Sequence, residues 1–349
     1  MRYTNVQLLR VAAAVGVVAH HTGAHGAAVL GVPSEDVAFL LNRVVVGFPV
    51  PLFFAVSGFV LTHAARSAPG GHSVGRFLIA RFLRLFPGYW LALGVALAMS
   101  AGGLLSPTHR ELLPHVNLGT FSLWPNGARS PLFLGVEWSL IYEVFLSASL
   151  ALIACGRVSL LVAVWLVVLG VKALAAPGYG SAVLPHWTTI GLSSFLVPFL
   201  LGVIAYHANV RAPRWVVAAL VGVCLFAGAS RATTDAANWN WGVAAAGVVW
   251  LAVRLPAVRP DHPLARLGDA TYGLFLIHVP VMLAVMYAGV WAGRIEGALL
   301  AGGVALVAGF AFGRLEAGLY SRLRPIGKWT RADVRARLRF RRPRLARTP

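Results

Sequence analysis

Near its start the chain carries the stretch QLLRVAAAVGVVAHH, residues 7–21. The stretch is typical of a membrane-spanning helix, but Arg10 stands near its beginning. His20 and His21 stand at its end, deep inside the apolar segment that continues to residue 30. At about 3.6 residues per turn, Arg10 and His21 fall on nearly the same helix face, roughly 16 Å apart along the axis, whereas His20 points about 100° away. An ionisable side chain in a hydrocarbon span is costly unless it faces protein or water, so the pattern favours a functional site. For a single histidine, the alternative is helix packing in which a neighbouring carbonyl binds the ring.

The whole chain has the composition of a polytopic membrane protein. It has 349 residues, of which 58% are hydrophobic and only 12% are charged, far from the balance of a soluble domain. Ten apolar segments are each long enough for a hydrocarbon core of roughly 30 Å, which predicts an all-α fold with about ten transmembrane helices. The first is too long, and holds too many ionisable groups, for a cleaved signal peptide. The segments are 6–30, 44–63, 82–102, 132–154, 158–176, 188–207, 214–230, 239–254, 270–291 and 296–317.

The basic residues indicate how these helices are oriented. The net charge is +19, and with the N-terminus inside, most of the 30 Lys and Arg residues fall in cytoplasmic segments. The positive-inside rule therefore predicts a multi-pass membrane protein with both termini in the cytoplasm. The high content of Ala, Gly and Arg indicates a bacterial source, so the inner membrane is the expected location. We expect a membrane domain over residues 1–320 and a basic cytoplasmic tail over 321–349 that binds anionic lipid of the inner leaflet. No motif for nucleic acid accompanies the charge, so no nucleic-acid partner is expected.

Three arginines stand around the start of the third apolar segment. Arg81 and Arg84 share a helix face at its predicted cytoplasmic mouth, and Arg76 lies about a turn and a half earlier. Paired guanidinium groups suit a polyphosphate, because each offers a planar fork of donors. Anchoring of the helix under the positive-inside rule is the alternative.

Two more ionisable residues lie within predicted spans. Glu143 is about half a span deep in segment 132–154, where a carboxylate needs a partner, and His21 or an arginine is the expected one. His278 lies in segment 270–291, about 13 Å deeper than Asp269 at its edge. A second buried imidazole supports a polar site in the interior of the bundle.

Other residues predict packing rather than chemistry. Ser57 and Gly58 permit close approach of two helices, and we expect the second segment to pack on the first. Lys172 and Asn238 lie near predicted membrane interfaces, where snorkelling or belt roles are expected.

Neither a metal site nor a disulfide is expected. Cys155 and Cys224 lie in apolar segments without the spacing of a disulfide framework or a zinc site. His21 and His25 have i, i+4 spacing, but no third ligand is placed to complete a metal site.

Several of these motifs, in the same order along the chain, resemble those of the acyltransferase-3 family. Members are integral-membrane enzymes that O-acylate bacterial glycans, lipid-linked sugars and some secondary metabolites. The resemblance covers residues from about 5 to 320, and the spacing of its first motif selects His21 over His20. Larger members carry an extracellular hydrolase-like domain, for which the basic tail is too short. The matching blocks are Arg10 to His21, FFAVSGF at 53–59, RFLR at 81–84, WSL at 138–140 with Tyr142 and Glu143, and LGD at 267–269 with Tyr272 to Pro280.

The resemblance implies acyl-CoA, with acetyl-CoA expected, as a co-substrate that arrives from the cytoplasm, and no permanently bound cofactor. Arg81 and Arg84, with Arg76 and Arg10, would bind its phosphates. His21 would remove the proton from a hydroxyl of a carbohydrate or glycolipid acceptor. Glu143 and His278 complete the expected catalytic set, since Glu143 would orient the imidazole and His278 would bind the acceptor or polarise the thioester.

Other chemistries fit the same residues. His21 would carry the acyl group itself if the reaction passed through a covalent intermediate. A transporter or flippase of an envelope precursor would use buried His, Glu and Arg as a relay, although the sequence lacks the internal repeat of many transporters. A membrane protein with a purely structural role is a third alternative. It is disfavoured because ionisable residues lie at three different depths of the predicted spans.

Overall fold

The computed structural model describes residues 3–30, 47–66, 73–153, 158–208, 212–230, 233–289 and 295–325, with backbone alone for 25–30, 153 and 295. This part of the chain is all-α: thirteen α-helices and short 3-10 turns, without a β-strand. Ten of the helices have eleven residues or more and follow the ten predicted segments in order. They are α1 (Thr4–Leu30), α2 (Pro49–Arg66), α3 (Val74–Ala101), α6 (Glu137–Ile153), α7 (Val158–Ala175), α8 (Val197–His207), α9 (Arg214–Ser230), α10 (Thr234–Arg254), α12 (Thr271–Tyr287) and α13 (Ile295–Leu323).

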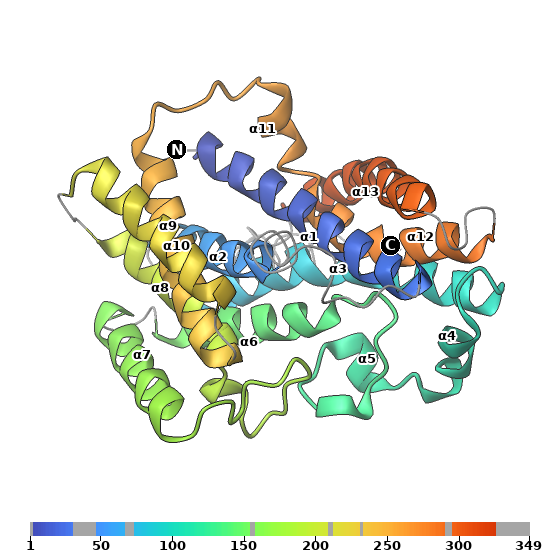
Figure 1. Cartoon of the computed structure of the whole chain (residues 1–349), viewed down its shortest axis with the longest axis horizontal. Helices are drawn as coiled ribbons and strands as arrows, with labels where there is room; N and C mark the ends of the chain where they lie inside the picture. Colours follow the sequence, from blue (N-terminus) through green and yellow to red (C-terminus); the bar gives the residue numbers. More distant parts are fainter. Residues whose placement is uncertain are drawn as a thin grey trace, which may run out of the picture.

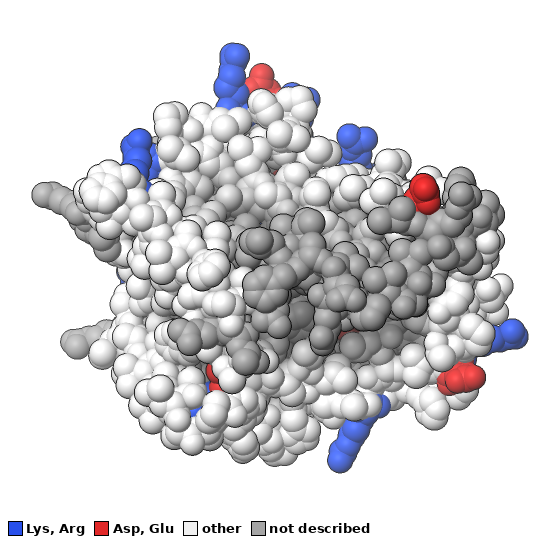
Figure 2. Space-filling model, in the orientation of Figure 1, with Lys and Arg blue, Asp and Glu red and all other residues white. Residues whose placement is uncertain are grey.

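The helices are those of a membrane protein. By length and composition, α3, α7 and α13 are each sufficient to cross a membrane. The outer face of α7 exposes a row of apolar side chains, and Figure 2 shows a face whose described charges stand mostly near its edges. The all-α membrane fold is confirmed, while the number of spans stays a prediction. The row consists of Val164, Val167, Val168, Val171 and Leu174.

Two helices, α3 and α8, begin farthest from their predicted starts. α3 begins at Val74, eight residues before the predicted segment, so Arg76, Arg81 and Arg84 lie within the helix rather than at its mouth. α8 is shorter than predicted, because two 3-10 turns precede it and Pro198, which lacks an N–H, occupies its first turn.

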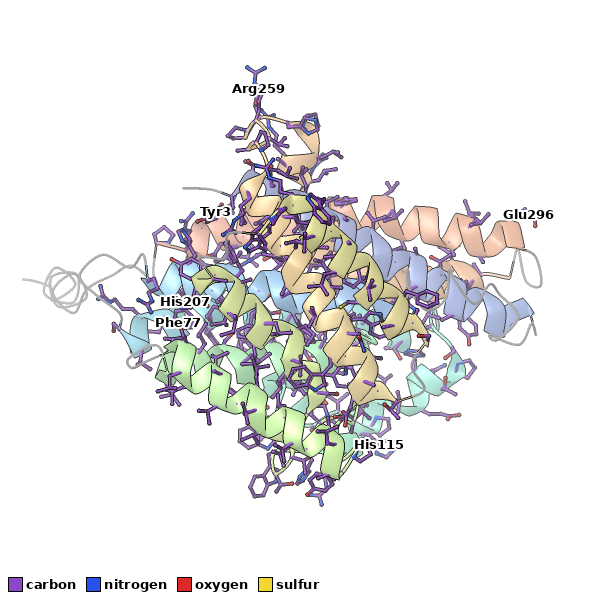
Figure 3. The ribbon with its side chains drawn as sticks, turned by 60° about the vertical axis from the view of Figure 1, so that its left-hand side comes forward. Tyr3, Phe77, His115, His207, Arg259 and Glu296 are labelled. Atoms are coloured by element: carbon purple, nitrogen blue, oxygen red, sulfur yellow. The ribbon has the colours of Figure 1, made fainter. Side chains whose placement is uncertain are left out.

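The bundle has two ends that differ in structure. At the amino end, where α1 begins, Tyr3 contacts Phe59 and His63 in the last turns of α2. At the opposite loop end, residues 102–136 form a connection that includes the short helices α4 (Pro107–Glu111) and α5 (Leu118–Ser122), at one edge of the view in Figure 1. In Figure 3, Tyr3 lies on the left, while His115 and Glu296 lie to the right.

Glycines bring helix backbones into direct contact at two crossings. A Cβ on Gly58 of α2 would collide with the carbonyl of Phe199 in α8, and one on Gly202 of α8 would collide with Ala55. The close approach predicted at Gly58 is therefore to α8 and not to α1, which packs on α2 through a separate apolar cluster. This is the small-residue packing by which membrane helices associate.

The second crossing joins α12 to α13. A Cβ on Gly313 would collide with the carbonyl oxygen of Ala270, and Gly273 faces Gly313 across the contact. No side chain separates the two backbones, so α12 is fixed against α13 at the point where it enters the bundle.

Gly313→Ala should therefore lower the melting temperature of the detergent-purified protein, because overpacking costs about 1–3 kcal/mol. Gly303→Ala is the matched control, since the same substitution on the same helix meets nothing within 4 Å. Equal melting temperatures for both variants would contradict this account of the crossing.

Candidate active site

A cavity lined by charged side chains lies in the amino-end half of the bundle. It has a volume of about 540 Å³ and is bounded by side chains of α1, α2, α3, α6, α12 and α13. Of the predicted site residues, Arg10, Arg81, Arg84 and Glu143 line it, whereas Arg76 is exposed and lies outside it. Its charged lining residues are Arg10, Arg81, Arg84, Arg324, Glu143 and Asp269.

Two of its arginines are held by carboxylates. Arg81 Nη2 donates to Glu143 Oε1 at 2.5 Å, so an arginine is the partner that Glu143 was expected to need. Arg84 Nη1 donates to Glu316 Oε1 at 2.5 Å. The Arg84 guanidinium also lies 4.9 Å from the centre of the Tyr272 ring and 4.8 Å from that of Tyr320. Each ion pair joins α3 to another helix.

Sequence reasoning missed Glu316 and Arg324. Glu316 is buried, and its signal was an acid within the last predicted span, 296–317. Arg324 lies one turn beyond Tyr320 and was counted as part of the tail. Neither Arg10 nor Arg324 has a salt bridge within the described part of the chain. Arg10 Nη1 donates a long hydrogen bond of 3.4 Å to Gln7 Oε1. The cavity thus carries more positive than negative side chains.

The second cavity lies toward the loop end and has a volume of about 370 Å³. His20 and His21 line it together with the aromatic side chains Trp138, Phe195 and Trp241. Val50, Ser139 and Phe275 line both cavities. The arginine-lined space and the histidine-lined space therefore meet at these three side chains.

The predicted histidines lie close to one another: His20 and His21 line the second cavity, whereas His278 lines neither cavity. The ring centres of His21 and His278 are 5.2 Å apart, and those of His20 and His21 are 4.8 Å apart. His278 is fully buried, and its Nδ1 lies 2.8 Å from the carbonyl oxygen of Phe275. Because a carbonyl only accepts, Nδ1 carries the proton, and in the neutral ring Nε2 is the acceptor. Glu143, by contrast, lines the larger cavity, where its hydrogen bond is to Arg81.

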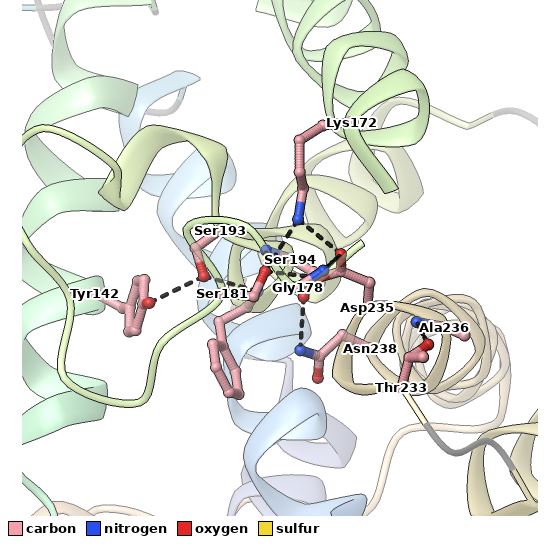
Figure 4. Close-up of polar contacts among 11 residues, drawn as sticks. Tyr142, Lys172, Gly178, Ser181, Ser193, Ser194, Thr233, Asp235, Ala236 and Asn238 are labelled. Atoms are coloured by element: carbon pink, nitrogen blue, oxygen red, sulfur yellow. Dashed lines mark hydrogen bonds and ion pairs between the residues drawn. The ribbon is translucent and has the colours of Figure 1, made fainter. Parts of the chain in front are cut away.

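A buried polar network stands beside the second cavity (Figure 4). Lys172 Nζ donates to Asp235 Oδ2 at 2.8 Å, and Ser181 Oγ donates to Asp235 Oδ1 at 2.6 Å. Asn238, which lines the cavity, donates to Ser194 Oγ at 3.0 Å. The snorkelling and belt roles predicted for Lys172 and Asn238 are wrong, because both side chains are buried and bonded inside the bundle.

Among the described residues, no group of three or more His, Cys, Asp or Glu side chains is arranged to hold a metal ion. Cys224 is buried and free, whereas Cys155 and the side chain of His25 lie outside the described part of the chain.

The fold is that of an all-α membrane protein whose interior holds a charged site. The family model described as an acyltransferase domain matches residues 3–314. The chain belongs to the acyltransferase-3 family, as its motifs indicated, and nothing in the comparisons supports a transporter. Comparison with curated proteins and with solved structures gave no match.

The Lys172–Asp235 pair should contribute strongly to stability. The two side chains are only 7% and 2% exposed, and loss of one partner from a buried pair costs about 3–5 kcal/mol. Lys172→Met should lower the melting temperature in detergent well below that of the wild type, and Lys172→Met combined with Asp235→Leu should recover part of the loss.

The control is Arg259→Met, which breaks an exposed pair 4.0 Å long and should change the melting temperature little. If Lys172→Met were no more harmful than Arg259→Met, the buried pair would not have the structural role assigned to it.

Proposed function

We propose that this acyltransferase transfers an acyl group, with acetyl expected, from acyl-CoA to a hydroxyl of a glycan or lipid-linked sugar. The observation that carries the proposal is the meeting of two cavities beside His21 and His278. One cavity is rich in arginine and suits an anionic donor, whereas the other is aromatic and polar and suits a sugar. A reaction between the two bound molecules takes place where the cavities join.

The donor phosphates bind in the amino-end cavity. Arg81 and Arg84 each use one terminal nitrogen on a carboxylate, and a guanidinium has five N–H donors, so both keep donors for a phosphate. Arg81 Nε is buried and has no hydrogen-bond partner within the described residues. Glu143 and Glu316 hold the two guanidinium groups in place, and Arg10 adds a charge that no carboxylate of the described residues contacts directly. Arg76 acts at longer range.

We place the amino end of the bundle at the cytoplasmic face of the membrane, where acyl-CoA is made. The second cavity then binds an acceptor that arrives from the opposite face. The excess of Lys and Arg in the segments assigned to the cytoplasm supports the same orientation. The basic tail beyond residue 325, which lies outside the described residues, binds anionic lipid at that surface.

His21 acts as the general base. It takes the acceptor's hydroxyl proton while the oxygen attacks the thioester carbonyl; the C–O bond forms, the C–S bond breaks, and the leaving thiolate receives the proton from His21. His278 lies against His21, and its Nε2, the acceptor in the neutral ring, can accept a hydrogen bond from a hydroxyl of the acceptor molecule. Only the protonated ring could polarise the carbonyl. Because Glu143 bonds to Arg81, we assign it to positioning that arginine rather than to orienting the imidazole. An acyl-His21 intermediate would use the same contacts in two steps.

His21→Ala should lower acyl transfer by about 10²–10⁴-fold, the usual contribution of a general base. His20→Ala should keep a substantial part of the activity, although both rings line the same cavity. The measurement is transfer of radiolabelled acetyl groups from acetyl-CoA into a cell-envelope extract by purified, equally folded variants. A greater loss in His20→Ala than in His21→Ala would reverse the assignment.

Arg81→Ala and Arg84→Ala should weaken CoA binding on the order of tenfold or more, because a hydrogen bond to a charged group contributes about 1.5–3 kcal/mol. Their effect on the maximal rate should be smaller, since contacts far from the thioester act as uniform binding. Calorimetric titration with CoA measures the first effect.

Arg76→Ala is the control, because this exposed arginine lies outside the cavity. Since Arg84 also holds Glu316, Arg84→Lys provides a milder variant that keeps the charge without the planar fork. Unchanged CoA affinity in the cavity variants, or an equal loss in Arg76→Ala, would leave these arginines with a structural role alone.

A further inference from the structure

Three side chains form the boundary between the two cavities. Val50 of α2, Ser139 of α6 and Phe275 of α12 line both spaces, and we call them the shared wall. A thioester that is anchored at the amino end and reaches His21 must place its acyl group against this wall. The wall is therefore where the enzyme contacts the part of the donor that is transferred.

Phe275 is the largest member of the shared wall. Its ring centre lies 5.6 Å from that of Phe53, which lines the larger cavity, and 6.0 Å from that of His278. Its carbonyl oxygen accepts the hydrogen bond from His278 Nδ1. The ring thus stands directly beside the histidine pair and on the donor's path toward it.

The shared wall cannot easily withdraw to admit a larger group. Phe275 lies two residues beyond Gly273, where the backbone of α12 is in contact with Gly313 of α13. Closely packed interiors move little, because any shift must displace several neighbours together. The position of the Phe275 ring is therefore held by the packing of α12 on α13.

The chemistry of the shared wall suits a short, uncharged acyl group. Val50 and Phe275 are apolar, and Ser139 Oγ donates to the carbonyl oxygen of Val136 at 2.9 Å, so its proton is already used. None of the three residues can neutralise a carboxylate, and a buried charge without a partner is strongly unfavourable. A dicarboxylic acyl group is disfavoured at the wall for that reason, and a long alkyl chain because it would have to displace the Phe275 ring, which lines both cavities.

We infer that the shared wall, chiefly through Phe275, limits the donor to short, neutral acyl groups. The inference rests on the proposed function and adds to it the residues that select the acyl chain. Replacing Phe275 by a smaller side chain should open the junction and shift the preference toward longer chains.

The test is calorimetric titration of the detergent-purified protein with acetyl-CoA, butyryl-CoA and succinyl-CoA, without an acceptor. Wild type should bind acetyl-CoA more tightly than the other two. Each buried methylene changes affinity about fourfold, so Phe275→Ala should shift the ratio of butyryl-CoA to acetyl-CoA affinity by on the order of tenfold in favour of butyryl-CoA. Phe275→Leu and Val50→Ala should shift this affinity ratio in the same direction by a smaller factor. If Phe275→Ala does not fold, these two variants are compared with the wild type instead.

Phe77→Ala is the matched control, because Phe77 lines the larger cavity from the first turn of α3, away from the shared wall. It should leave the ratio of affinities unchanged. The inference is overturned if wild type binds the three donors equally, if the wall variants leave the ratio unchanged, or if Phe77→Ala shifts it as much. If wild type binds neither CoA nor any acyl-CoA, the proposed function itself fails.

Discussion

Charged side chains buried within an apolar helix bundle need an opposite charge or contact with water, and this requirement governs the structure. The three buried or half-buried ion pairs in the described part of the chain each join two helices that are far apart in sequence. Arg81 and Arg84 connect α3 to α6 and α13, and Lys172 connects α7 to α10. The same pairs that stabilise the bundle also set where its cavities can lie.

The ion pairs do not neutralise all the charged side chains, and the two cavities therefore differ in the kinds of side chain that line them. The amino-end cavity keeps an excess of guanidinium groups, although two of them are partly neutralised by Glu143 and Glu316. The second cavity is lined by imidazole and aromatic rings, and the Lys172–Asp235 network supports its edge. The two cavities share a wall of three uncharged side chains, Val50, Ser139 and Phe275. In the proposed reaction the donor and the acceptor approach this wall from different cavities.

The sequence was a good guide to which residues are unusual and a poor guide to their partners. Arg10 and Glu143 were selected because ionisable groups are costly in a membrane span, and Arg81 and Arg84 because paired guanidinium groups suit a polyphosphate; the fold places all four on one cavity. Glu316 and Lys172 also lie within predicted spans, but Glu316 was missed and Lys172 was assigned to a membrane interface. A lysine near a helix end extends to the membrane surface unless a carboxylate lies close enough to form an ion pair with it. For Lys172 that carboxylate is Asp235, which only the fold brings near.

The sequence by itself determined the all-α membrane fold, the order of the helices and the family, because hydrophobic segment length and local motifs are properties of consecutive residues. Only the tertiary structure decided that Gly58 meets α8, that Glu143 holds Arg81, and that Phe275 stands between the cavities beside His278. These contacts arise between segments far apart in the chain. They depend on which helix backbones approach most closely, and a glycine permits such an approach without specifying the partner.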